Sequence, residues 1–134
     1  MSVEVFSSEW LTIEASTERV FAMACDMECF GSLLPEQIEN WKTTGDSCSF
    51  TIKGMADITL QFAEKQPYSL VSLQPSGKAP FPFSLELHIA EEHEKSKVKV
   101  RLEADLNPLL SMMASRPLQN LVDTMAQKAH ASWF

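Results

Sequence analysis

The sequence predicts an α+β domain in which a curved antiparallel sheet of about six or seven strands packs its concave face on one long C-terminal helix. Apolar residues repeat with a period of two from Gln37 to Asp105, which is typical of strands with one buried face. Two short helical patterns follow the first strand. A final apolar stripe at helical spacing begins after Asn107, and this order of elements leads to the fold prediction.

Length and charge restrict the domain organisation and the classes of partner. The chain has 134 residues and a formal net charge of −7, with 45% hydrophobic and 22% charged residues. Such a length is typical of one domain, so we expect a single domain over residues 1–134. The one basic stripe, Lys95 to Arg101, alternates with apolar residues and has glutamates around it. Because phosphate repels an acidic surface, we expect no nucleic-acid partner.

The three cysteines, Cys25, Cys29 and Cys48, are an odd number without the spacing of a disulfide framework. Cys25 and Cys29 lie four apart, the spacing of metal ligands on a helix, but no histidine is near them in sequence, so buried structural thiols are favoured over a metal site. Met1 to Glu4 does not resemble a signal peptide, and no apolar stretch approaches the ~20 residues of a membrane span. We therefore predict reduced, metal-free thiols, no membrane span and a cytoplasmic location.

The N-terminal part predicts one interrupted strand and two short helices. Val3 to Ala15 is rich in strand-forming residues, and Ser7 to Glu9 breaks its alternation, which predicts a bend or bulge. Ser16 is an N-cap candidate for the first helix and Asp26 for the second. Pro35 is expected to end the second helix.

The central part predicts an antiparallel meander with one wet and one buried face. Apolar residues alternate with polar ones in five runs. The positions predicted to face inward are Cys48, Phe50 and Ile52; Ile58, Leu60 and Phe62; Val71 and Leu73; Phe83, Leu85, Leu87 and Ile89; and Val98, Val100, Leu102 and Ala104.

The C-terminal part predicts the long helix. Asn107 is an N-cap candidate and Pro108 suits the first helical position, where its missing N–H costs nothing. The apolar stripe comprises Leu118, Leu121, Val122, Met125 and Ala129. Pro117 interrupts this pattern, so we expect the helix to bend or break around Ser115 and Arg116.

Three segments resemble the START-like or helix-grip superfamily, also called SRPBCC, the polyketide cyclase/dehydrase and lipid-transport group. They are Ile13 to Phe21 at the strand-to-helix corner, Leu34–Pro35 after the second helix, and Ala104 to Pro108 opening the last helix. The resemblance spans nearly the whole chain. It implies an apolar cavity between the sheet and the long helix, and roles that range from lipid or hormone binding to polyketide cyclisation, co-chaperone activity and cofactor assembly. The fold cannot choose among these roles.

The inward positions predict a cavity without polar groups. The residues expected to line it are Phe50, Ile52, Leu60, Phe62, Phe83, Leu85, Leu87, Val100, Leu102, Met113, Leu121 and Met125. This lining favours non-catalytic binding of a small hydrophobic molecule or lipid, with no cofactor. A cyclase-type enzyme would need Ser72, Thr51 or Asp57 to face inward. An interaction or assembly module would have large side chains filling the interior.

Polar candidates for catalysis fall on the wrong face. Glu86 and His88 share the strand face opposite the apolar positions, so we expect them to be solvated and predict no catalytic residue. His93 and His130 are also expected in solvent. The 78–83 segment places Phe81 between two prolines, where it forms either the lip of a cavity mouth or an inward plug, and the plug is favoured. Trp133 and Phe134 pack on the sheet or form a dimer contact; the oligomeric state is left open.

Overall fold

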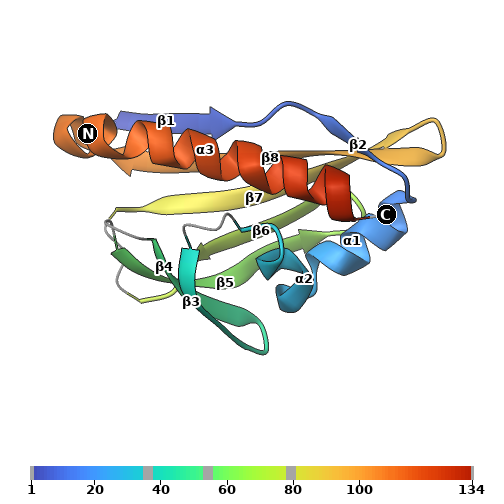
Figure 1. The fold of residues 1–134 in the computed structure, drawn as a ribbon, viewed down its shortest axis with the longest axis horizontal. Coiled ribbons are helices and arrows are strands. Elements are labelled where there is room, and N and C mark those ends of the chain that lie inside the picture. The colour runs from blue at the N-terminus through green and yellow to red at the C-terminus, as the bar shows by residue number, and fades with distance from the viewer. Residues whose placement is uncertain (1, 35–37, 53–55, 78–80, 134) are drawn as a thin grey trace.

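The computed structural model describes residues 2–34, 38–52, 56–77 and 81–133 (Figure 1). These residues form one sheet and three helices. In chain order they are β1 (Ser2–Ser7), β2 (Leu11–Ile13), α1 (Thr17–Ala24), α2 (Met27–Gly31), β3 (Ile38–Thr44), β4 (Ser47–Ile52), β5 (Ala56–Gln66), β6 (Leu70–Pro75), β7 (Phe83–Glu92), β8 (Lys95–Leu106) and α3 (Pro108–Ser132).

The eight strands form one antiparallel sheet, as the alternating patterns predict. Its order is β1-β8-β7-β6-β5-β4-β3, and β2 pairs with β8 beyond the end of β1. Figure 1 shows α3 lying lengthwise over β1 and β8, with α1 and α2 beside its C-terminal half. The sheet therefore curves around α3 and leaves its other face to solvent.

The predicted interruption of the first strand is confirmed. Ser8 lies between β1 and β2, and both of these strands pair with β8. Its N–H donates to the carbonyl of Val100 at 2.9 Å, and its Oγ accepts from the Val100 N–H at 2.9 Å. The Ser8 side chain thus replaces a backbone acceptor where the strand bulges, which lets β1 and β2 follow one neighbour.

All three predicted N-caps are present. The Ser16 hydroxyl accepts from the Arg19 N–H at 3.3 Å, and the Asp26 carboxylate accepts from the Glu28 N–H at 2.9 Å. Asn107 Oδ1 accepts from the N–H of Leu110 at 2.9 Å. Each cap satisfies one N–H that a helix start leaves without an intrahelical partner. The α2 helix ends at Gly31, and Pro35, expected to end it, lies outside the described residues.

The α3 helix runs without a break through Pro117, so of the bend or break expected near Ser115 and Arg116 the break is wrong. Ala114 and Leu118, on either side of the proline, are both buried on the face toward the sheet. Since packing on that face stabilises both halves along one axis, the loss of one hydrogen bond at Pro117 does not end the helix.

The inward register of the sheet is confirmed by burial. Phe50, Leu60, Leu85, Val100 and Leu102 are each at most 5% exposed. They belong to one continuous core with the inner face of α3. This core also contains Trp133, which is 1% exposed, so the terminal tryptophan packs inward; Phe134 lies outside the described residues.

The contact between Gly31 and Trp41 fixes α2 against the sheet. A Cβ added at Gly31 would lie 2.3 Å from the indole ring of Trp41. That indole stacks in turn on Phe50, with ring centroids 6.0 Å apart. The glycine therefore allows a tight contact that no larger residue permits without moving the ring.

We expect Gly31→Ala to lower the free energy of unfolding by about 1–3 kcal/mol, because it overpacks this contact. Thermal or urea unfolding measures the change. Trp41→Leu removes the obstructing ring, so adding Gly31→Ala in that background should cost much less. Equal costs in both backgrounds would contradict the steric explanation.

Candidate ligand cavity between the sheet and the C-terminal helix

An apolar cavity remains where the concave sheet meets the middle of α3. Its volume is about 20 Å³. The lining comes from four strands, from α3 and from two segments beside them. The lining residues are Leu34, Phe50, Ile58, Leu60, Phe81, Phe83, Leu85, Leu102, Leu118 and Leu121. None of these side chains can donate or accept a hydrogen bond.

Half of the predicted cavity residues line this space: Phe50, Leu60, Phe83, Leu85, Leu102 and Leu121. Leu87, Val100 and Met125 are fully buried in the core away from the cavity. Phe62 is half-buried beneath the Lys65 ammonium, 4.3 Å from its ring centroid. The side chain of Ile52 lies outside the described residues.

The prediction for Met113 is wrong. Its side chain is 62% exposed, on the face of α3 directed away from the sheet. The reason is helical phase: Ala114, the next residue, points to the sheet, and successive residues diverge by about 100° around a helix. Leu109 and Met112 are also exposed at the start of α3.

Phe81 packs inward and is 5% exposed. The inward plug is therefore confirmed, and the alternative of an exposed lip is wrong. Its ring lies 5.7 Å from that of Phe83, and both rings line the cavity. The segment at 78–80 that precedes it lies outside the described residues. Phe81 belongs to no helix or strand, so its position depends on side-chain packing rather than on backbone pairing.

The volume sets what this space can hold as it stands. A cavity needs roughly 10–15 Å³ to take one water, and sites for drug-sized ligands are commonly ~300–1,000 Å³. The cavity is therefore nearly filled by its own lining. Any larger guest requires displacement of side chains.

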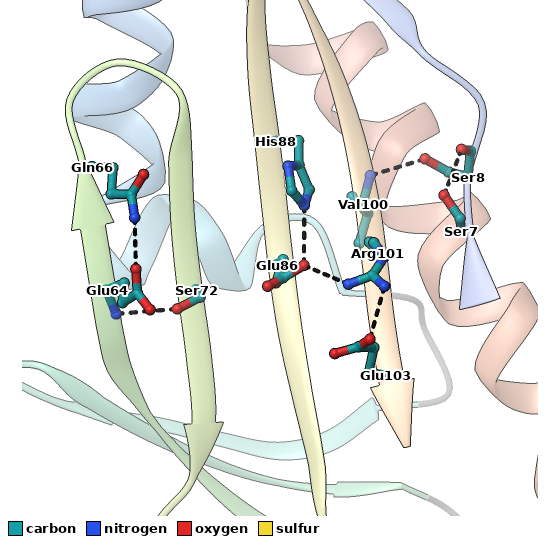
Figure 2. A network of polar contacts seen from close by, with 10 residues as sticks. All are labelled: Ser7, Ser8, Glu64, Gln66, Ser72, Glu86, His88, Val100, Arg101 and Glu103. Atoms are coloured by element: carbon teal, nitrogen blue, oxygen red, sulfur yellow. Dashed lines mark hydrogen bonds and ion pairs between the residues drawn. The ribbon is translucent and has the colours of Figure 1, made fainter. Parts of the chain in front are cut away.

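The outer face of the sheet carries a polar network, drawn in Figure 2. His88 Nε2 and Arg101 Nη1 each lie 3.0 Å from Glu86 Oε1, and Arg101 Nη2 donates to Glu103 at 2.8 Å. Glu86 and His88 lie on the predicted face, but their side chains are only 21% and 32% exposed, so full solvation is wrong. Neighbouring strands cover them.

Burial alone would raise the pKa of Glu86, but the bonds from His88 and Arg101 outweigh it and lower that pKa.

The side chains that a cyclase-type enzyme would need do not line the cavity. Ser72 accepts from the Glu64 N–H at 3.1 Å on the outer face, as Figure 2 shows. The Thr51 hydroxyl donates to Asp57 at 2.6 Å. Thr51 and Asp57 line an open groove of about 710 Å³ along the outer side of β4 and β5. The polar candidates and the apolar cavity are thus on opposite faces.

The cysteines are free thiols, and none is activated. Burial raises the pKa of Cys48 to about 11, although a backbone hydrogen bond to Leu60 opposes it. Burial also raises the pKa of Cys25 and that of Cys29, the latter with help from the charges of Asp26 and Glu28. Among the described residues no cluster of histidine, cysteine or carboxylate could hold a metal ion.

The remaining histidines lie at the surface, as predicted. His93 and His130 are both exposed. His130 Nδ1 bonds the backbone carbonyl of Thr12 and so ties the end of α3 to β2. Within the part of the chain that the structure describes, no helix combines the length and hydropathy required to cross a bilayer.

The lowered pKa of Glu86 gives a stability prediction. A carboxylate with a depressed folded-state pKa contributes stability above its usual value of 4.5, and that contribution is lost as the pH falls through the folded pKa. We therefore expect Glu86→Gln to lower the melting temperature at neutral pH, and the difference from the parent to shrink as the pH falls below 4.5. Melting curves over a pH series test this. Glu91→Gln, an exposed position on the same strand, should leave the profile unchanged.

No protein-family model and no curated protein matches the sequence, whereas solved structures match the fold. Norcoclaurine synthase from Thalictrum flavum, in complex with dopamine and hydroxybenzaldehyde, matches with a TM-score of 0.70 at 16% identity, covering 98% of this chain and 88% of that chain. The KanY protein gives 0.78 at 11% identity, covering 98% and 97%. Ara h 8.0201 gives 0.58 at 13%, covering 98% and 100%. The chain therefore has the helix-grip fold of these structures.

Proposed function

We propose that the chain binds a small apolar molecule, or the apolar end of a lipid, between the sheet and α3, and that it carries out no chemistry on this ligand. The observation that carries the proposal is the lining: all ten side chains are apolar, and three are phenylalanines. An apolar ligand that enters leaves water, which gains roughly 25 cal/mol per Å² of buried surface. The lining offers no acid, base or nucleophile, so desolvation is the driving force.

The ligand enters by displacing Phe81. The cavity of about 20 Å³ is too small for a ligand of several carbon atoms unless a side chain leaves. Phe81 is the best candidate, because it lies outside the strands and helices and its ring lines the cavity beside Phe83. Outward rotation of one phenyl ring would add its own volume to the site.

Two further observations support a binder over a cyclase-type enzyme. Thr51, Asp57 and Ser72 do not line the cavity, whereas an enzyme needs a polar group beside its substrate. The norcoclaurine synthase structure shows that a protein of this fold can hold small aromatic molecules. Three free thiols favour a reducing compartment such as the cytoplasm for this activity.

An interaction module with a filled core is the second candidate. The first turns of α3 expose Leu109, Met112 and Met113 by 66%, 84% and 62%. Three large apolar side chains on one solvent-facing stretch are typical of a contact surface. The near-filled interior supports the same function.

The plug gives the first test. Phe81→Ala should enlarge the cavity, so the variant should melt at a lower temperature and recover stability when an apolar fluorescent dye is added. The parent should bind the dye more weakly than the variant. Leu87→Ala is the matched control: this buried residue lies outside the lining, so its loss should destabilise without adding dye binding. If neither the parent nor Phe81→Ala binds dye, the interaction module replaces the binder.

Two tryptophan substitutions one turn apart on α3 separate filling from overpacking. Leu121 lines the cavity, so Leu121→Trp should fill it, reducing dye binding while the fold survives. Met125 is fully buried in a packed region, so Met125→Trp should cost about 1–3 kcal/mol or more. Thermal melts and dye titrations of both variants measure these effects. Equal destabilisation would show that the cavity cannot accept a guest.

A further inference from the structure

β1 forms an edge of the sheet, and among the described residues Gln119 is the one side chain that bonds its outward backbone groups, at the Ser7 carbonyl. The Ser8 N–H donates to the carbonyl of Val100, and the Asp105 N–H donates to that of Pro82 on the opposite side of β8. Because antiparallel pairing alternates, the N–H and C=O groups of Val3, Val5 and Ser7 point away from β8. Gln119 of α3 confirms this direction, since its amide donates to the Ser7 carbonyl at 3.1 Å.

Apolar side chains flank this edge on both faces of the sheet. Val3 and Val5 are 65% and 50% exposed on the outer face. On the concave side Met112, 84% exposed, lies seven residues before Gln119 and therefore on the same side of α3, toward β1. Natural edge strands usually carry lysine, proline or an inward charge to prevent pairing, whereas β1 has one charged residue, Glu4.

The sequence of β1 is complementary to itself in an antiparallel register. We propose that β1 pairs antiparallel with β1 of a second copy of this chain, about a two-fold axis at Val5. Val5 then faces Val5 of the partner subunit, and Val3 faces Ser7 of the partner subunit. The Val5 pair exchanges two backbone hydrogen bonds, and each Ser7 N–H donates to the Val3 carbonyl of the partner subunit. Each Val3 N–H donates to the Ser7 carbonyl of the partner subunit, which also accepts from Gln119 of its own chain through its second lone pair. Glu4 faces Phe6 of the partner subunit, whereas an axis at Glu4 would oppose two carboxylates. Charge therefore favours the Val5 axis over the Glu4 axis.

A groove of about 380 Å³ at the end of β1 leaves room for the partner strand to continue. It lies between the β1–β2 connection and α3. Its lining residues are Ser7, Ser8, Glu9, Leu11, Gln119, Asp123, Ala126 and Gln127. In the Val5 register, Ser2 of the partner subunit lies opposite Ser8, at the groove. The partner strand therefore meets an open groove and the Gln119 side chain where β1 ends.

Such an interface joins two six-residue strands and a few side chains. It falls in the class of small interfaces, below about 1,200 Å², which associate weakly. The dimer is therefore concentration-dependent.

Sedimentation velocity over a wide concentration series, combined with amide hydrogen exchange by NMR, tests the proposal. We expect the average mass to rise toward that of two chains. Over the same series, the amides of Val3, Val5 and Ser7 should become protected from exchange. A monomer at every concentration would overturn the proposal, and so would a dimer in which these amides stay unprotected.

Variants at Val5 separate backbone pairing from other effects. Val5→Pro removes the backbone N–H of Val5, which pairs with no group of its own sheet. In the dimer the two copies of this N–H supply two of the six interchain hydrogen bonds, so dimerisation should weaken about tenfold or more. Val5→Thr keeps that donor and should weaken it far less. If Val5→Pro fails to fold by circular dichroism, Val5→Lys serves in its place, because an exposed lysine blocks edge pairing. Gln74→Lys, with the same added charge on an exposed strand position, is the control and should dimerise normally. Unchanged association of the folded Val5 variants would overturn the proposal.

Discussion

The packing of α3 on β8 and its neighbours is the interaction on which the rest of the structure depends. Three alanines, Ala114, Ala126 and Ala129, lie on the buried face of the helix and are at most 1% exposed. Small residues allow the helix axis to approach the strands closely, as they do wherever two elements meet at short distance. This approach buries Val122 and Met125 completely and closes most of the space that the concave sheet would otherwise enclose. The small cavity lies beside Leu118 and Leu121, where the buried face of the helix carries leucines and not alanines.

Two properties of the molecule follow from this packing, and they occupy separate surfaces. The small apolar cavity lies inside, beneath Phe81 and against the middle of α3. The edge without a partner strand lies outside, along β1, where the helix covers the inner face of the strand and reaches its rim through Gln119. A second strand added at β1 would lengthen the sheet without touching Leu34 or Phe81. The proposed ligand binding and the proposed self-association can therefore change independently of each other.

Most of the fold could be predicted because its determinants are local. A capping side chain such as Asp26 acts within three residues, and strand alternation reports directly which face is buried. The cavity depends on pairs of distant residues and was predicted only in half. Ile58 and Leu118 were on the predicted inner faces, but nothing in the pattern distinguishes a wall of the cavity from the packed core. Periodicity does not place Met113, because Leu109, Leu110, Met112 and Met113 spread apolar side chains around most of the first turns of α3. The bonds of Glu86 join neighbouring strands whose register no local pattern gives.

The pairing of β1 with β8 has a consequence for synthesis of the chain. Ser2 pairs with Leu106, so the first strand waits for about a hundred further residues before its partner exists. At the usual rate of about 5–20 residues per second, this interval lasts roughly 5–20 s. During that time the segment Val3-Glu4-Val5-Phe6 has no strand to pair with, and the inner face of the meander has no α3 to cover it. Contacts of such long sequence separation also slow folding. The nascent chain therefore has to keep its apolar strands from aggregating until its last helix has left the ribosome.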